Sequence, residues 1–174
     1  HSRPSVGGAP SLGGAGHSST RGRGGAGREH GPEGPVLAAG ALHQWVWDSA
    51  APLWESGHLG EAVQAAARTL NAHLQTKIGR RDASEWKLIT DAFSTKDPQP
   101  GRPRLRLMEP DGSDTFINRH EGAGFFARGC YQALRNVLVH EVNQEPSEAY
   151  ALQALAAFSL VASWIDDAWV STAD

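Results

Sequence analysis

Three polar residues of the kinds that catalyse proton and phosphoryl transfer lie close together near residue 140. Arg135 and Asn136 are adjacent, and His140 follows four positions after Asn136. If a helix continues to residue 140, Asn136 and His140 share one face, and Arg135 lies about 140° around the helix from His140. An arginine fork fits a phosphate, a histidine exchanges a proton near neutral pH, and an asparagine can hold either group in place. The set therefore suits phosphoryl transfer without a metal ion.

The same three residues also fit a structural role. A histidine at the carboxyl end of a helix interacts favourably with the helix dipole, and an arginine there can extend into solvent. The spacing alone leaves both interpretations open.

The elements around these residues follow a helical period. We expect a first helix from about Leu42, bent or broken near Pro52, and a second over residues 59–78 that Gly79 ends. A shorter helix is expected after Ser84, which would be its N-cap.

Two further helices complete the pattern. Apolar residues predict one from about residue 121 to His140, and another from Pro146 to Trp169. The predicted fold class is all-α: a bundle of four to five helices with a small hairpin insertion around residues 103–118.

The predicted hairpin pairs residues 105–107 with residues 115–117 across a turn at residues 110–112. Arg102, Arg104 and Arg106 alternate along its first strand, so their side chains would lie on one side. This edge would either contact RNA phosphates or be a solvated edge that its charges protect from pairing.

Composition separates a tail from a body. Residues 1–36 contain 11 of the 20 glycines, and we expect a disordered tail or linker there, with a helical domain over residues 38–172. The chain begins with His rather than Met, which fits a fragment or a processed form. From residue 41 onward there are 12 basic and 17 acidic residues, which argues against non-specific nucleic-acid binding by a basic surface.

Other patterns exclude several classes of protein. A single cysteine, Cys130, excludes a disulfide framework and indicates a reducing compartment; it lies on an apolar stripe and is expected in the core. No apolar run is long and uniform enough to predict a membrane span, so we expect a cytoplasmic protein without a membrane partner. His140-Glu141 begins like a zinc-protease motif, but position 144 is Gln.

Five sequence blocks carry a resemblance to a known family. They are residues 45–48 (WVWD), 52–58 (PLWESGH), 61–66 (EAVQAA), 91–94 (DAFS) and 135–141 (RNVLVHE). The last block contains the spacing Arg-Asn-x-x-x-His that is typical of the HEPN superfamily of helical bundles, many of which are metal-independent ribonucleases. In their order, over roughly residues 42–167, the blocks resemble the Ymh-type hypothetical proteins, a HEPN branch found in bacterial and phage-defence contexts.

The resemblance implies an RNA-cleaving homodimer whose two Arg–His motifs face one composite cleft. His140 would be the general base or acid, Arg135 would stabilise charge on the phosphate, and Asn136 would orient the phosphate or His140. No divalent ion or other cofactor is implied, and the products would carry 2′,3′-cyclic phosphates. An acidic residue sometimes joins such sites, and the candidates are Glu55, Glu61 and Glu141, each of which could equally be an ordinary exposed carboxylate.

Two hypotheses result. The first is a metal-independent endoribonuclease, a hydrolase with a defence or toxin role, acting alone or with another defence-system protein. The second is a non-catalytic HEPN module for dimerisation or for sensing a nucleotide or RNA, tethered to another domain. It is motivated by the acidic body and by Val137, which stands where related sequences often have a helix-ending Pro.

Overall fold

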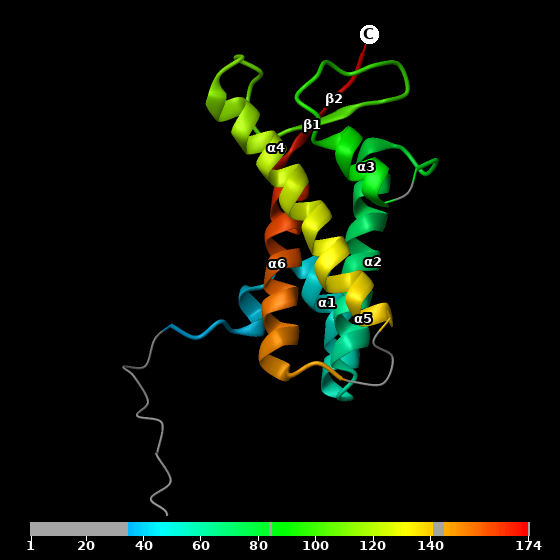
Figure 1. Cartoon of the computed structure of the whole chain (residues 1–174), viewed down its shortest axis with the longest axis vertical. Coiled ribbons are helices and arrows are strands. Elements are labelled where there is room, and N and C mark those ends of the chain that lie inside the picture. The colour runs from blue at the N-terminus through cyan, green and yellow to red at the C-terminus, as the bar shows by residue number, and fades with distance from the viewer. Residues whose placement is uncertain (1–34, 84, 141–144, 174) are drawn as a thin grey trace, which may run out of the picture. The chain divides into compact units, whose positions relative to one another are not determined.

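A computed structural model describes residues 35–83, 85–140 and 145–173, without the side chain of His140. The described residues from Val36 onward form one compact unit (Figure 1). The predicted tail lies outside the described residues as far as residue 34, as do the predicted N-cap Ser84 and the candidate Glu141.

The unit is a helical bundle, which confirms the predicted fold class. Its elements, in chain order, are η1 (Ala39–Ala41), α1 (Gln44–Glu55), α2 (Leu59–Ile78), α3 (Glu85–Ala92), β1 (Arg104–Arg106), α4 (Asp114–Gly129), η2 (Cys130–Arg135), α5 (Asn136–His140), α6 (Glu148–Asp167) and β2 (Trp169–Ser171).

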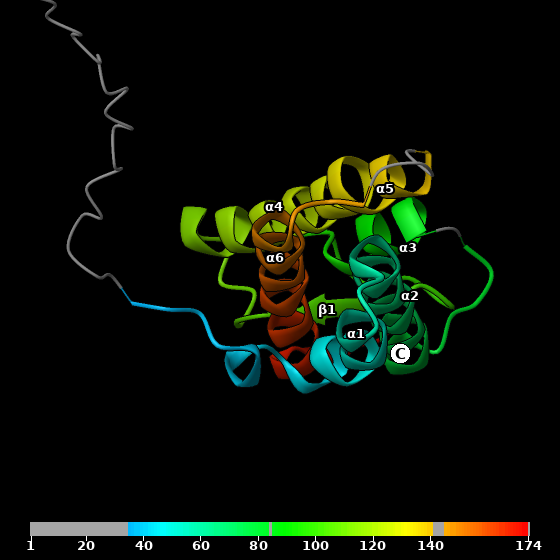
Figure 2. The ribbon, with the colours of Figure 1, turned by 90° about the horizontal axis from the view of Figure 1, so that it is seen from below.

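The long helices α2 and α6 form the centre of the bundle. Leu70 and Leu74 of α2 and Leu155, Phe158 and Ile165 of α6 are each at most 1% exposed. Figure 2 shows α4 and α5 on one side of this pair and α1 on the opposite side. The α4–η2–α5 run therefore lies across the central pair and exposes its outer face.

Side-chain caps and glycine set the helix ends. Ser113 Oγ accepts a hydrogen bond from the Phe116 N–H (3.1 Å), so α4 begins at Asp114, well before the predicted residue 121. Gly79 ends α2 with φ of 65°, as predicted. The first helix was expected to bend or break near Pro52, but α1 continues through this residue to Glu55.

The predicted hairpin is wrong in its pairing. β1 pairs antiparallel with β2, so that Leu105 lies opposite Val170. Residues 115–117 belong instead to the first turns of α4, because the Ser113 cap starts a helix there. Trp169 was expected in the last helix but lies in β2, since α6 ends at Asp167.

Among the described residues, α6 is the one helix long and apolar enough to cross a membrane by length and composition. Its buried face includes Leu155, Phe158 and Ile165, and it packs against α1, α2 and α4. A core helix of a bundle has the same length and composition.

Candidate functional site: the turn that carries Arg135 and Asn136

A π-helical segment, η2, precedes the candidate site. It spans Cys130–Arg135, between α4 and α5, where the sequence predicts an uninterrupted α-helix. A π turn closes i→i+5 hydrogen bonds and so shifts the facing of every residue that follows it. Such turns are rare in proteins overall, and many of those that occur lie at functional sites. Here the π turn ends at Arg135, the first residue of the motif.

The π turn is anchored to the core by a tyrosine. Tyr131 donates a hydrogen bond from its hydroxyl to the Ala67 carbonyl of α2 (2.9 Å), and its ring packs edge-on against Phe158 of α6 (5.4 Å between centroids). Burial raises the pKa of the Tyr131 phenol, so it stays protonated and able to donate. The altered facing of Arg135 is therefore fixed by contacts with both central helices.

Cys130 begins the π turn and is 4% exposed, which confirms its predicted place in the core. Burial raises the pKa of its thiol to about 11, so it is protonated at neutral pH and unsuited to nucleophilic attack.

Arg135 contacts two groups. Its Nη1 donates a hydrogen bond to Asn136 Oδ1 (3.1 Å) and lies 3.6 Å from Glu85 Oε2. The Arg135 side chain is 28% exposed, and Asn136 is exposed at the surface. Arg135 and Asn136, predicted to act together, are thus in direct contact with one side open to solvent.

His140 is the last residue of α5, one helical turn after Asn136. Positions four apart share a face of an α-helix, so the backbone places His140 and Asn136 on one face of α5. The His140 side chain lies outside what the structure describes.

Of the predicted acidic residues the structure describes Glu55 and Glu61, and neither forms an ion pair with the motif arginine. Glu55 ends α1 and Glu61 lies in the first turn of α2, and both are exposed. Glu85, in the first turn of α3, is the carboxylate near Arg135. Sequence reasoning missed it, because its only local signal was an acidic residue at a helix start, which the helix dipole favours anyway.

The start of α2 lies near the residues that precede α6. The Gly60 N–H donates a hydrogen bond to Glu145 Oε2 (2.9 Å). This contact places the first turn of α2, with Glu61, beside the segment that leads into α6.

Two of the three arginines expected to face RNA are buried. Arg104 is 5% exposed and Arg106 is 2% exposed. Arg106 donates from Nη1 to the Ser94 carbonyl (2.6 Å) and from Nη2 to the Lys96 carbonyl (2.7 Å). The predicted phosphate-contacting edge is therefore wrong for Arg104 and Arg106; Arg102 alone of the three is exposed. The segment with Ser94 and Lys96, together with the Phe116 ring, lies against Arg106 on the side that the two arginines share.

Within the described ranges, no group of three or more His, Cys, Asp or Glu side chains could hold a metal ion. The candidate site is built from a guanidinium, an amide and a carboxylate.

Comparison with known families covers most of the bundle. Residues 40–165, from η1 to near the end of α6, match the family described as a protein of unknown function (Hypoth_ymh). The chain belongs to the Hypoth_ymh family. No curated protein and no solved structure matches it. The Hypoth_ymh match confirms the Ymh-type part of the resemblance, and the matched range includes Arg135, Asn136 and His140. It does not by itself show membership of the HEPN superfamily.

Proposed function

We propose that this Hypoth_ymh protein is a metal-independent endoribonuclease of HEPN type, acting as a cytoplasmic homodimer in a defence or toxin role. One observation gives the main support for the proposal. The π turn ends at Arg135, whose Nη1 lies 3.1 Å from Asn136 Oδ1 on a partly exposed surface. A strained or unusual turn that ends at a polar pair of catalytic type is more typical of a site than of a plain helix end.

The chemistry assigns one task to each residue. His140 removes the proton of a ribose 2′-hydroxyl, or protonates the leaving 5′-oxygen. The 2′-oxygen then bonds to phosphorus as the bond from phosphorus to the 5′-oxygen breaks, which leaves a 2′,3′-cyclic phosphate. Arg135 stabilises the negative charge that gathers on the phosphoryl oxygens, and Asn136 holds Arg135 or the phosphate in place.

Exposed apolar side chains beside the motif support a homodimer. Val137 is 39% exposed and Val139 is 37% exposed on α5, next to the polar residues of the site. A second copy that covers these valines would bring a second motif to the same cleft, as the HEPN resemblance implies.

The test is cleavage of end-labelled tRNA and mRNA in the presence of EDTA. We expect the wild-type protein to cut and to leave 2′,3′-cyclic phosphate ends, and both Arg135→Ala and His140→Ala to lower the rate about 100-fold or more. Arg119→Ala and His58→Ala replace an exposed arginine and an exposed histidine elsewhere, and should cut like wild type. Cleavage that needs a divalent ion, or that survives both motif substitutions, contradicts the proposal.

A non-catalytic RNA- or nucleotide-sensing module is the second candidate. It is favoured by the contacts of Arg135, because Glu85 already offers a carboxylate to this guanidinium at 3.6 Å. RNA binding that depends on Arg135, in a protein that cuts no RNA, would select this function over the first.

A further inference from the structure

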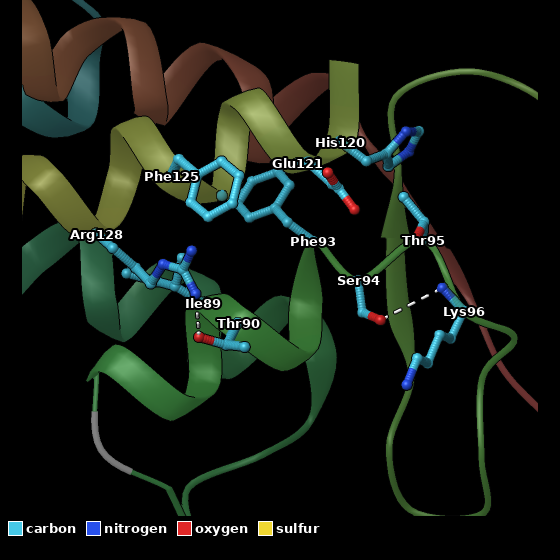
Figure 3. A pocket seen from close by; sticks show the side chains of 11 residues that line it. Ile89, Thr90, Phe93, Ser94, Thr95, Lys96, His120, Glu121, Phe125 and Arg128 are labelled. Carbon is cyan, nitrogen blue, oxygen red and sulfur yellow. Dashed lines mark hydrogen bonds between the residues drawn. The ribbon is translucent and has the colours of Figure 1, made fainter. Parts of the chain in front are cut away.

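A hollow lies on the face formed by α3 and α4, and its lining includes none of the motif residues. It has a volume of about 240 Å³ and is open to solvent on one side. Figure 3 shows its lining: Phe93 and Phe125 on the apolar side, Arg128 and Thr90 at one end, and Ser94 and Lys96 at the other. Drug-sized ligand sites are roughly 300–1,000 Å³, so this pocket has room for one small aromatic group with a charged group at its rim.

An ordered row of planar groups forms one end of the pocket. The Arg128 guanidinium carbon lies 4.7 Å from the Trp86 ring centroid and 4.8 Å from that of Phe125. Arg128 Nη1 also donates a hydrogen bond to Thr90 Oγ1 (3.0 Å), which fixes the orientation of the guanidinium. Phe125 is 62% exposed and Trp86 is 49% exposed, so the row presents aromatic surface to solvent. Exposed aromatic rings beside an arginine are a common platform for stacking a nucleic-acid base.

The opposite end of the pocket suits an anion. The Lys96 side chain is exposed, and the Ser94 hydroxyl accepts a hydrogen bond from the Lys96 N–H (3.3 Å), which leaves the hydroxyl hydrogen able to donate. An ammonium and a hydroxyl donor at one edge of a pocket are typical of phosphate binding.

Glu121 adds a selective acceptor between these two ends. Its carboxylate is exposed and lines the pocket, as Figure 3 shows, on the helix that also carries Phe125. A carboxylate accepts two hydrogen bonds side by side, which matches the two adjacent N–H groups on the pairing edge of guanine. Uracil offers one N–H between two carbonyl oxygens, and a carboxylate repels these.

His120 shapes the pocket but is not free to bind a ligand. It is fully buried; its Nδ1 donates to the Phe116 carbonyl (2.8 Å), and its Nε2 accepts from the Leu107 N–H (3.0 Å). Burial lowers the pKa of His120, in agreement with a neutral ring that uses both nitrogens in these bonds.

We propose that this pocket binds a single guanosine phosphate, with the base stacked on Phe125, its pairing edge on Glu121 and the phosphate on Lys96. The ligand is either a free nucleotide or one residue of a single-stranded RNA. In the second case the inference rests on the proposed function and deepens it, because the pocket would select the strand that is cut.

The first turn of α3 connects the pocket to the motif. Glu85 contacts Arg135, and its neighbour Trp86 stacks on Arg128. Arg128 and Arg135 lie seven residues apart on the continuous α4–η2–α5 run. An extended RNA strand that follows this run meets both the pocket and the motif.

The experiment titrates the His140→Ala variant of this chain by calorimetry, so that no ligand can be cut. The ligands are GMP, UMP, guanosine, and the single-stranded RNA pentamers UUGUU and UUUUU. We expect GMP to bind roughly tenfold more tightly than UMP. If the ligand is part of a strand, UUGUU should likewise bind more tightly than UUUUU. Binding of GMP alone identifies a free nucleotide as the ligand, and binding of UUGUU alone identifies a strand.

Three substitutions separate the contacts. Phe125→Ala should weaken every ligand, Lys96→Glu should weaken GMP about tenfold and guanosine little, and Glu121→Gln should reduce the preference for guanine. Arg119→Glu makes the same charge change as Lys96→Glu at an exposed position of α4 outside the pocket, and should bind GMP like the parent protein.

The results overturn the inference if neither GMP nor UUGUU binds at millimolar concentration. They also do so if GMP and UMP bind equally, or if Arg119→Glu weakens binding as much as Lys96→Glu. Failure of the nuclease is distinguishable: a protein that binds guanosine phosphate in the pocket and never cuts RNA refutes the nuclease alone. Cleavage by a protein that binds neither GMP nor UUGUU refutes the pocket alone, and cleavage that is indifferent to Phe125 and Lys96 refutes the strand as the ligand of the pocket.

Discussion

Two pairs of arginines in this protein differ in what their guanidinium groups contact. Arg104 and Arg106 on β1 are almost fully buried and donate to backbone carbonyls. Arg128 and Arg135 lie on the α4–η2–α5 run, where they contact aromatic rings, a hydroxyl, an amide and a carboxylate of their neighbours.

The difference shows that partners, rather than residue type, decide what an arginine does. The β1 pair donates to backbone carbonyls of the neighbouring loops, and burial lowers the pKa of both guanidiniums without removing their charge. The helical pair keeps one side open to solvent and is able to meet a phosphate. We therefore expect the β1 pair to govern stability and the helical pair to govern RNA chemistry.

Substitution of Arg106 should give the largest loss of stability. Arg106→Met keeps much of the apolar stem but removes the donors to the Ser94 and Lys96 carbonyls, so unfolding free energy should fall by about 3 kcal/mol. Urea unfolding followed by circular dichroism measures this. Arg102→Met, at the exposed arginine of the same segment, should change the unfolding free energy by less than about 0.5 kcal/mol. Equal losses in the two variants would contradict a structural role specific to the buried arginine.

The region around the buried arginines should also respond to acid. His120 is neutral in the folded protein and has a pKa below its ordinary value of 6.5, because of burial and, less strongly, of Arg106 and Arg119. Below about pH 6.5 the unfolded chain binds a proton at His120 that the folded protein does not bind. The free energy of unfolding therefore decreases as the pH is lowered, by up to about 1.4 kcal/mol per pH unit.

The pH effect is measured by urea unfolding at pH 7, 6 and 5. His120→Gln should be less stable at pH 7, since Gln fits the two hydrogen bonds imperfectly, but its stability should depend less steeply on pH. His58→Gln, at an exposed histidine, should keep the wild-type slope. A His120→Gln slope equal to that of wild type would show that another group causes the acid sensitivity.

Substitution of Glu85 should give the smallest change in stability, and it tests whether Arg135 of the helical pair is available to RNA. Glu85→Gln removes a partly exposed charge from Arg135 and should change unfolding free energy by no more than about 0.5 kcal/mol. If Arg135 meets a phosphate, release from Glu85 should increase RNA affinity severalfold, which a filter-binding assay measures. Glu109→Gln removes an exposed carboxylate that lies outside both the pocket and the motif, and serves as the charge-matched control. Weaker RNA binding by Glu85→Gln would show that Glu85 positions Arg135 for RNA rather than competing with it.

Local patterns in the sequence predicted the helices well and the long-range contacts poorly. Leu70 and Leu74 lie on the predicted face of α2 because helical spacing depends only on near neighbours. The partner of β1 lies more than 60 residues away in β2, and the local turn at residues 110–112 favoured a hairpin instead. With that pairing wrong, the burial of Arg104 and Arg106 could not be predicted.

The candidate site was predicted in part for the same reason. Arg135 and Asn136 are consecutive in the sequence, so no tertiary contact is needed to bring them together. The π turn was not predicted, because the apolar residues from 130 to 138 fit an α-helical stripe equally well. Its Tyr131 bonds to the Ala67 carbonyl, which is far away in sequence and which no local pattern indicates. Glu85 likewise reaches Arg135 only through the packing of α3 beside the α4–η2–α5 run.

The most direct test measures RNA cleavage in EDTA and the thermal midpoint on the same preparations of wild type, Arg135→Ala and Arg106→Met. The account predicts that Arg135→Ala unfolds within about 3 °C of wild type and loses cleavage about 100-fold or more, whereas Arg106→Met unfolds at least about 6 °C lower and, below that temperature, still cuts. An Arg135→Ala protein that cuts RNA as well as wild type, or that loses as much stability as Arg106→Met, would contradict it.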